Sequence, residues 1–325
     1  MTRAVLVSSS TAPVVTDVDV PDPGEGEALV DVAFSSVNYK DGLALARDPG
    51  VARIDPLVPG IDVVGTVAAL GPGVHDVRIG DRVVLNGAGA GENRHGGWAV
   101  HALVPSASLV VLPDEVAEDF VAAVGTAGFT AALSVVALAR FVDPADGPVL
   151  VTGASGGVGS VAIPLLAGRG YRVTASTGRT GNADALRALG AADVVDRATL
   201  GDRGRPMQKA VWAGAVDSVG GATLANLLAS TRWGGAVTAC GLAQDAELHT
   251  TVLPFILRGV SLLGINSVDA PAALRRQAWE VLADELDPVL LAGVTRTVGL
   301  SEAIDVGPEV VAGRVHGRTI VDVRR

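Results

Sequence analysis

The sequence predicts an α/β protein with a β-rich N-terminal domain followed by a doubly wound parallel sheet. Residues 1–118 consist of short apolar runs separated by turns rich in Pro and Gly, a pattern typical of a small β-barrel or sandwich. From residue 149 onward, strand-like and helix-like runs alternate, which is typical of a parallel sheet covered by helices. The chain has 325 residues, of which 49% are hydrophobic and 18% charged, so two domains with sizeable cores are expected.

The β-rich part is expected to end near Pro113, where the hydrophobic pattern changes. Residues 114–140 are rich in Ala and Val at helical spacing and contain few turn residues, so we expect a helix there. The clearest strands before this point are residues 4–7, 27–34, 62–70 and 82–85.

The second half is expected to form the parallel sheet, and residues 299–325 return to a mixed pattern that ends in a strand at 319–323. Pro164 lies inside the first helix after residue 149, and because proline has no N–H, we expect it to kink or shorten that helix. We predict strands at 149–152, 172–175, 193–195, 215–218, 235–239 and 260–268, and helices at 157–168, 182–189, 222–230 and 271–286.

A glycine-dense turn lies between the first strand and the first helix of this second half. Glycine lets the backbone approach a pyrophosphate closely, and a helix N-terminus offers free N–H groups and the positive end of a dipole. An ordinary strand–helix turn is the alternative, but this strand–turn–helix context is the one that a dinucleotide motif requires. We therefore expect the turn to cradle a pyrophosphate through Gly156, Gly157, Val158 and Gly159.

The end of the next strand favours NADPH as the cofactor. NAD-binding proteins of this kind usually place an Asp or Glu there to hold the ribose 2′-OH. Here the sequence reads Ala175-Ser176-Thr177-Gly178-Arg179, without an acid. Arg179 can pair with a 2′-phosphate that a carboxylate would repel. A solvated loop arginine is the alternative, and the missing acid decides for NADPH.

Charge and cysteine content exclude several classes of protein. The net charge of −10 makes nucleic acid and anionic membranes poor partners. The single cysteine, Cys240, allows no disulfide within the chain and fits a reducing cytoplasm. The N-terminal segment lacks a signal-peptide pattern, and no stretch reaches the roughly 18 uninterrupted apolar residues of a membrane helix. We expect a cytoplasmic protein.

Several phrases, spread over nearly the whole chain in the expected order, resemble the medium-chain dehydrogenase/reductase superfamily. They are most similar to its zinc-free, quinone-oxidoreductase-like branch, and within it to the NADPH-dependent acryloyl-CoA reductase subfamily. The phrases are Ser36-Val37-Asn38-Tyr39-Lys40-Asp41, Pro59-Gly60-Ile61-Asp62, Gly125-Thr126-Ala127-Gly128-Phe129-Thr130, Ala239-Cys240-Gly241-Leu242-Ala243, Pro254-Phe255-Ile256-Leu257-Arg258-Gly259 and Gly317-Arg318-Thr319.

The resemblance implies a GroES-like β-barrel catalytic domain and a Rossmann nucleotide domain. The catalytic domain would take residues 1–118, the NADP-binding domain residues 119–267, and a return segment, 268–325, would complete the catalytic domain. In zinc enzymes of the superfamily, the catalytic ligands would fall near Asn38, Ile61-Asp62 and Thr126. Asn, Ile and Thr are not a zinc set, because the metal prefers thiolate, imidazole or carboxylate. We therefore expect no metal, and an acceptor that is already activated by conjugation to a carbonyl.

By resemblance, Tyr39 lies beside the nicotinamide and could donate a hydrogen bond to the substrate; a core tyrosine is the alternative. Asn38 and Asp41 are candidate catalytic residues together with Tyr39: Asn38 is expected to line the pocket, and Asp41 with Lys40 would either support it or form a loop ion pair. Position 266 is Asn where the family usually has Asp, which puts a charged role there in doubt. The resemblance assigns cofactor contacts to Tyr39, Thr126, Ser155, Thr177, Gly178, Arg179, Arg197, Leu242, Ile256 and Ser267.

Two further features are tempting. Cys240 could be a nucleophile, but no His is near it in sequence, so we expect an inert core thiol. Residues 87–97 are rich in glycine, but no helix follows them, so a second phosphate loop is rejected. We expect a mobile loop over the active-site cleft, with Glu92 and Asn93 facing the substrate.

These features predict an NADPH-dependent reductase that transfers hydride to the conjugated C=C of a small enoyl thioester, acrylyl-CoA being favoured. A reductase with a quinone acceptor is the second hypothesis, and an NADPH-binding sensor or scaffold with little turnover is the third. Lys40, Arg47, Arg53 and Arg94 are candidate cations for CoA phosphates, although each could be a solvated surface charge. We expect a homodimer joined through the edge strand at 260–268.

Overall fold

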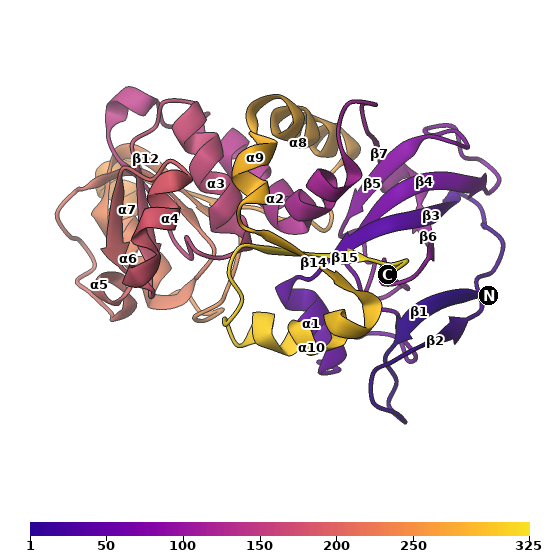
Figure 1. The fold of residues 1–325 in the computed structure, drawn as a ribbon. Coiled ribbons are helices and arrows are strands. Elements are labelled where there is room, and N and C mark those ends of the chain that lie inside the picture. Colours follow the sequence, from indigo (N-terminus) through magenta and orange to yellow (C-terminus); the bar gives the residue numbers. More distant parts are fainter. The chain divides into compact units, whose positions relative to one another are not determined.

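The computed structural model describes residues 1–325, apart from the side chain of Thr180. The chain forms two compact units (Figure 1). Unit 1 comprises Met1–Phe129, Ser267–Glu280 and Leu291–Arg325, and unit 2 comprises Thr130–Asn266 and Val281–Leu290.

Unit 1 is built on a seven-stranded sheet with the order β14-β15-β3-β4-β5-β7, in which β6 also pairs with β3. A separate antiparallel pair joins β1 and β2. Its core is dominated by valines, as the low aromatic content of the sequence requires. The strands are β1 (Thr2–Leu6), β2 (Val14–Val18), β3 (Glu27–Ser36), β4 (Asp62–Leu70), β5 (Arg82–Asn86), β6 (His101–Pro105), β7 (Val110–Val111), β14 (Thr295–Gly299) and β15 (Arg318–Asp322).

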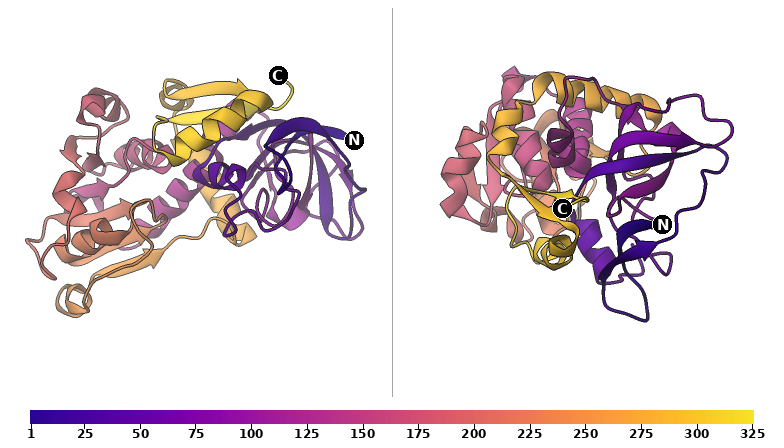
Figure 2. Two further views of the ribbon diagram at one scale, coloured as in Figure 1. Left: turned by 90° about the horizontal axis from the view of Figure 1, so that it is seen from below. Right: turned by 45° about the vertical axis from the view of Figure 1, so that its right-hand side comes forward.

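Strands from the N-terminal and C-terminal parts of the chain pair in this sheet. β15 pairs antiparallel with β3, so that Ile320 lies opposite Ser36. The C-terminal segments, drawn in yellow, accordingly lie beside indigo and purple N-terminal strands (Figure 2). Helices α1 (Tyr39–Leu45) and α10 (Leu300–Val311) lie side by side (Figure 1). They contact at Gly42 and Gly307, where a side chain on Gly42 would overlap the Gly307 carbonyl.

Unit 2 contains a six-stranded, entirely parallel sheet with the order β10-β9-β8-β11-β12-β13. Counted from β8, this is the order 3-2-1-4-5-6 of a doubly wound dinucleotide-binding fold, whose switch point lies between β8 and β11. The strands are β8 (Val149–Val151), β9 (Val173–Thr177), β10 (Asp193–Asp196), β11 (Trp212–Asp217), β12 (Thr231–Ala239) and β13 (Ser261–Gly264).

The helices of unit 2 pack on this sheet and on one another. They are α3 (Gly157–Gly168), α4 (Ala183–Ala188), α5 (Ala198–Gly201), α6 (Gly221–Ser230) and α7 (Leu253–Arg258). The remaining helices are α2 (Glu118–Leu138), α8 (Ala272–Glu285) and α9 (Pro288–Ala292), with short 3-10 turns at Ser106–Ser108, Pro144–Asp146 and Thr180–Asn182.

The structure differs from the expected bounds of one strand and shows that one helix is not shortened. The strand expected at 260–268 is restricted to Ser261–Gly264, because its partner β12 ends at Ala239, opposite Gly264. It does lie at the edge of the sheet, as expected. Pro164 does not shorten α3, which keeps its full predicted length. Eight consecutive residues of α3 are buried, and this packing outweighs one lost backbone hydrogen bond.

Helix α2 is apolar, and among the described residues it is the one helix whose length and composition would suit a membrane span. Most of it is buried inside the protein, so it is a core helix. Gly125 interrupts it with φ 49° and ψ −164°, a conformation that favours glycine. A Cβ at Gly125 would lie 2.6 Å from an Arg318 guanidinium nitrogen and 2.7 Å from Asp62 Oδ2, so a side chain there is also excluded by contact.

The segment 87–97 is packed, which corrects the expectation of a mobile loop. Gly91 donates its N–H to the Arg94 carbonyl at 2.9 Å, and Arg53 donates to the Glu92 carbonyl at 3.0 Å. The side chain of Glu92 is only 7% exposed and pairs with Lys40, so it does not face a substrate. The glycines of the segment 87–97 allow close approach of backbone to backbone: a Cβ on Gly97 would overlap the Asp62 carbonyl.

Candidate active site

The glycine turn of unit 2 follows β8 and begins α3. Gly153 has φ 58°, and Gly156 is the N-cap of the helix. Gly159 fits because it has no side chain: a Cβ would lie 2.5 Å from the Ala154 Cα. As in any helix, the first N–H groups of α3 have no intrahelical acceptor. The turn is therefore a backbone cradle that suits a phosphate, which is the fit expected for a dinucleotide.

Asp217 supports this turn through hydrogen bonds. Its side chain is fully buried at the end of β11, where Oδ1 accepts a 2.6 Å bond from the Thr152 hydroxyl and Oδ2 a 2.8 Å bond from the Gly220 N–H. Burial raises the pKa of Asp217, and these donors oppose that rise. The carboxylate thus ties together the ends of the two central strands, β8 and β11, at the switch point of the sheet.

Five of the residues predicted to contact the cofactor come together at or after the ends of β8, β9 and β10. The hydroxyls of Ser155 and Thr177 are 2.8 Å apart, and the Arg179 N–H donates to the Thr177 hydroxyl at 3.1 Å. Arg197 donates its N–H to the Thr177 carbonyl, and its guanidinium lies against Gly178, whose absent Cβ would be 2.5 Å from Nε. Hydroxyls and a guanidinium therefore converge where a ribose phosphate is expected.

The other predicted cofactor residues are more scattered. Leu242 follows β12 and is 62% exposed, and its Cα lies close to Gly220. Ile256 is 69% exposed on α7, which packs against β12. Thr126 and Ser267 belong to unit 1. Their roles toward a cofactor stay predictions.

Unit 1 contains a buried polar cluster around Asp62, at the start of β4. Oδ1 of Asp62 accepts bonds from the Thr126 N–H at 2.8 Å, from the Thr126 hydroxyl at 2.6 Å and from the Asn86 amide at 2.8 Å. Oδ2 accepts from the Ser36 hydroxyl and, at 2.8 Å, from the Asn38 amide. This carboxylate therefore joins residues from β3, β5, α2 and the start of α1.

Arg318 supplies the positive charge of this cluster from β15. It is 3% exposed and donates to the Ala123 carbonyl at 2.6 Å, the Ser36 hydroxyl at 3.1 Å and the Asn38 side-chain oxygen at 3.2 Å. Burial lowers the pKa of Arg318, while the charge of Asp62 raises it. A guanidinium remains charged even so, and it compensates a buried carboxylate.

Asp41 is fully buried at the third position of α1. Its Oδ1 accepts from the Gly60 and Ile61 N–H groups at 3.0 and 2.9 Å, and its Oδ2 from the Asn38 N–H at 2.7 Å. Burial first, and then the charge of Asp62, raise the pKa of Asp41 to about 7, against the effect of these hydrogen bonds. Asp41 caps its own helix and holds the chain before β4, and it has no exposed surface to offer a substrate.

Tyr39 begins α1 and is 46% exposed, so its ring is not part of the core. The next residue, Lys40, pairs with Glu92 at 2.8 Å rather than with Asp41. The helix that carries Tyr39 is thus anchored by this ion pair and by the carboxylate of Asp41. The structure leaves the phenol at the surface of unit 1, where it can make a contact with a ligand.

Cys240 lies just beyond β12 and donates to the Asp217 carbonyl at 3.2 Å. Burial, together with the charge of Asp217, raises the pKa of its thiol to about 12. A thiol of this kind is a poor nucleophile near neutral pH, which agrees with the expected inert role.

Sequence reasoning missed the central members of the unit 1 cluster, Arg318 and Asp62, as site residues. A signal was present for Arg318, because an arginine immediately before an apolar terminal strand must either reach solvent or find a buried partner. Asp217 and Glu92 were also missed as anchoring residues, and no local pattern marks them.

Comparison with known proteins decides the family. The family model described as "Alcohol dehydrogenase GroES-like domain" matches residues 24–114, and the one described as "Zinc-binding dehydrogenase" matches residues 157–286. The protein named acrylyl-CoA reductase AcuI of Ruegeria pomeroyi is 46% identical over 97% of this chain and 96% of its own length. The chain belongs to the medium-chain dehydrogenase/reductase superfamily. The predicted family and fold class are confirmed.

Other members of the superfamily are similar over the whole chain. The crystal structure of the YhdH oxidoreductase from Salmonella enterica in complex with NADP has a TM-score of 0.93 and 40% identity, covering 99% of this chain and all of that one. The Bacillus subtilis protein YhfP, named as a putative quinone oxidoreductase, is 43% identical over 94% of this chain and 92% of its own. Its crystal structure with NAD bound has a TM-score of 0.92, covering 99% of each chain. The chain is therefore an oxidoreductase that uses a nicotinamide cofactor.

The zinc in the name of one family model does not fit the residues of this chain. The positions expected for a catalytic zinc by resemblance, Asn38, Asp62 and Thr126, are instead joined to one another by hydrogen bonds. An amide and a hydroxyl are weak zinc ligands, and the one carboxylate already accepts bonds on both oxygens. Among the described residues, no group of three or more His, Cys, Asp or Glu side chains is placed to hold a metal ion.

Proposed function

We propose that this chain is an NADPH-dependent reductase of a small enoyl thioester, with acrylyl-CoA as the substrate. The observation that carries the proposal is its 46% identity, over almost the whole chain, to a protein named acrylyl-CoA reductase. The residues of unit 1 supply no metal set to polarise an unactivated alcohol or ketone. A substrate that brings its own conjugated carbonyl is the chemistry that such a site supports.

For the cofactor, NADPH is favoured over NADH. The chain has no acid at Thr177-Gly178-Arg179, and the guanidinium of Arg197 lies beside Gly178. The backbone N–H groups at the start of α3 would bind the diphosphate, and Arg179 with Arg197 would pair with the 2′-phosphate. NADPH, when bound, supplies the hydride for reduction of the C=C bond.

On the substrate side, Tyr39 is the residue that we assign to contact. Its phenol would donate a hydrogen bond to the thioester carbonyl and so orient the acceptor. Asn38 and Asp41, first expected to be catalytic, are better described as positioning residues, because their polar atoms already bond within the cluster. Of the candidate cations for CoA phosphates, Lys40 and Arg94 are paired with Glu92 and Glu27, which leaves Arg47 and Arg53 as the better candidates.

A quinone acceptor is the second candidate, favoured by the 43% identity to YhfP. A steady-state scan of NADPH oxidation with acrylyl-CoA, crotonyl-CoA and a small quinone, at matched cofactor concentration, separates the two. The proposal expects acrylyl-CoA to have the highest kcat/KM. A much higher value for the quinone would replace it with the second candidate, and tight NADPH binding without turnover of any acceptor would leave a sensor or scaffold.

We also propose a homodimer in a reducing cytoplasm. One edge of β13 is unpaired in the unit 2 sheet, and an exposed strand edge is a template for a second chain. The neighbouring α7 region exposes Val252, Ile256 and Leu257, at 64%, 69% and 59%, which a partner would cover. A monomer at micromolar concentration in light scattering would contradict the dimer. The cytoplasm is supported by the single cysteine, which is free.

A further inference from the structure

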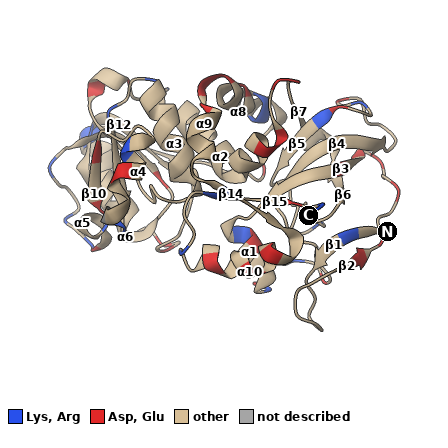
Figure 3. Ribbon diagram, viewed as in Figure 1, with Lys and Arg blue, Asp and Glu red and all other residues tan. Residues whose placement is uncertain are grey.

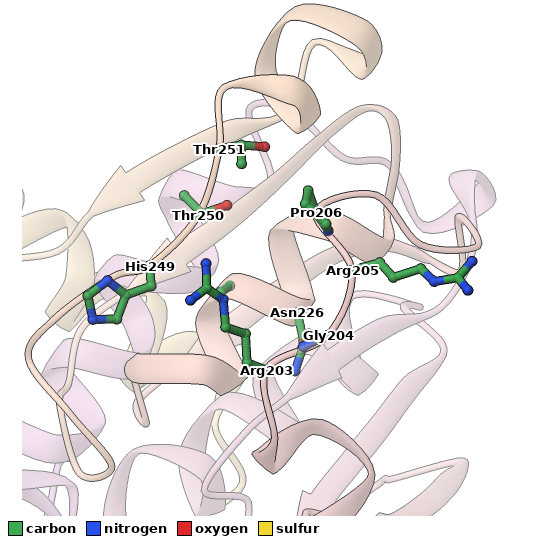
Figure 4. Close-up of a pocket in the computed structure, with 9 residues that line it drawn as sticks. Arg203, Gly204, Arg205, Pro206, Asn226, His249, Thr250 and Thr251 are labelled. Atoms are coloured by element: carbon green, nitrogen blue, oxygen red, sulfur yellow. Dashed lines mark hydrogen bonds between the residues drawn. The ribbon is translucent and has the colours of Figure 1, made fainter.

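A hollow in unit 2 lies outside the glycine turn and shares no lining residue with it. The hollow is open to solvent. Its polar lining consists of Arg203 and Arg205 before β11, Asn226 on α6, and His249, Thr250 and Thr251 before α7 (Figure 4). We propose that this hollow is a second anion site that binds a phosphate group.

The hollow is lined by positively charged side chains, whereas the chain as a whole is negatively charged. The protein carries a net charge of −10, and acidic residues occur in both units (Figure 3). The guanidinium groups of Arg203 and Arg205 make no hydrogen bond or ion pair with any described residue. Two unpaired arginines next to a concave surface form a local positive field on an acidic protein, and such a field attracts anions.

The loop that carries these arginines is fixed in place. Asn226 is 5% exposed, and its amide oxygen accepts from the Gly204 N–H at 3.1 Å and the Gln208 side chain at 2.7 Å. Its amide nitrogen donates to the Leu200 and Asp202 carbonyls at 2.9 and 2.7 Å. All of its hydrogen-bonding capacity toward this loop is used. A loop held in this way loses little conformational entropy when it binds a ligand.

The opposite end of the loop is fixed by a second side chain. Arg258, at the end of α7, donates to the Gln208 carbonyl at 2.6 Å and to the Ala229 carbonyl at 3.0 Å. Gly204 also has no room for a side chain, because a Cβ would lie 2.5 Å from the Asn226 amide oxygen. The loop conformation therefore depends on Asn226, on Arg258 and on the absence of a side chain at Gly204, and not on Arg203 or Arg205.

The side chains converge from two sides. In Figure 4 the guanidinium of Arg203 points toward His249 and Thr250, whereas Arg205 extends away from them. The His249 ring is oriented by Glu247, whose carboxylate is 2.9 Å from Nε2. A guanidinium, an imidazole and a hydroxyl that approach from different directions suit an anion with several oxygens, and Arg binds phosphate in bidentate fashion. Arg203, His249 and Thr250 are thus the residues assigned to the phosphate.

The phosphate could come from two sources, a free inorganic anion or the phosphoadenosine end of a nucleotide. The test is isothermal titration calorimetry on the protein saturated with NADPH, so that the cofactor's own phosphate site is filled. The probes are pyrophosphate and adenosine 3′,5′-bisphosphate. One pyrophosphate per chain is expected. A bisphosphate that binds more tightly than pyrophosphate identifies a nucleotide as the source, and equal or weaker binding identifies the free anion.

The decisive variant is Arg203→Gln, which should weaken binding of pyrophosphate about tenfold, the loss of one charge-assisted hydrogen bond. Its matched control is Lys209→Gln, which removes the same charge from the same loop but does not line the hollow. That control should change the Kd by less than about twofold. Absence of binding to the unmodified protein at millimolar pyrophosphate, or equal losses in the two variants, would overturn the proposal.

Discussion

The glycine turn of unit 2 and the Asp62 cluster of unit 1 handle charge in opposite ways. The turn consists of backbone N–H groups at a helix start, with cations at its rim and room left by glycine. The cluster buries an arginine and two aspartates and uses nearly every polar atom internally. A ligand-binding site leaves some hydrogen-bond donors without a protein partner, whereas a structural cluster pairs its donors with other residues. The same contrast separates residues that bind from residues that position.

The largest expected effect is on the closed cluster. Arg318→Met should lower the free energy of unfolding by about 3–5 kcal/mol, because it leaves Asp62 buried without its cation. Arg324→Met removes an exposed pair with Asp31 in the same terminal segment and should cost less than about 1 kcal/mol. Urea denaturation of both variants measures the difference. Similar costs would mean that the cluster does not depend on a buried charge.

Titration of Asp41 gives the next effect. Its pKa is raised from 3.8 to about 7 in the folded protein, so the folded state binds the proton more tightly and stability is lost as pH rises through this interval. The stability advantage of the unmodified protein over Asp41→Asn should therefore shrink by roughly 2–3 kcal/mol from pH 5 to pH 8. Urea denaturation at several pH values measures it.

A matched carboxylate provides the control for this experiment. The exposed Asp55 has its pKa lowered, chiefly by hydrogen bonds from Ser9, so it is ionised throughout the interval from pH 5 to pH 8. Asp55→Asn should show a stability difference that does not change over this range. A difference that is equally flat for Asp41→Asn would show that Asp41 does not titrate there.

The open turn should respond through binding rather than through stability. Gly159→Ala places a Cβ 2.5 Å from the Ala154 Cα, so the turn must shift, and the affinity for NADPH should fall about thirtyfold. Gly168→Ala, at the other end of the same helix, meets nothing within 4 Å and should bind NADPH normally. Fluorescence titration of NADPH compares the two. If both variants bind equally well, close approach at Gly159 is not what forms the cradle.

The smallest effect concerns the rim of the turn. Arg197→Ala should weaken NADPH about tenfold and leave NADH nearly unchanged, because only NADPH carries the 2′-phosphate. Arg172→Ala, just before β9 at its other end, removes an exposed pair with Asp193 and should not alter either affinity. Equal losses for both cofactors in Arg197→Ala would remove the basis for NADPH preference.

The contrast also explains what could be predicted from the sequence. The glycine turn was predicted because its signal is local: strand, glycines and helix follow one another within about a dozen residues. The parallel sheet followed from the same alternation of periods. β13 proved shorter than its apolar run, because a strand also needs a partner and β12 ends first. Pro164 does not shorten α3, because burial of this helix is a tertiary effect that the local sequence does not show.

The closed cluster could not be predicted in the same way. It joins Ser36, Asn38, Asp62, Thr126 and Arg318, which are separated by as many as 282 residues. No spacing or period links them, and only the sheet brings them together. The ion pair of Lys40 with Glu92 has the same character. The resemblance covered these positions, but it gave a role only to Asn38, as pocket lining, and to Thr126, as a cofactor contact, and it did not indicate that the five residues form one hydrogen-bonded cluster.

The position of β15 has a consequence for the order in which the protein can fold during synthesis. Ser36 lacks its strand partner until Ile320 has been synthesised, and Asp62 lacks its compensating cation until Arg318 has been synthesised. The ribosome makes the whole of the unit 2 sheet before it reaches Arg318 and Ile320, since that sheet ends at Gly264. The parallel sheet can therefore fold while the nascent chain is still attached, whereas the earlier-made strands remain incomplete until β15, Arg318–Asp322, has emerged.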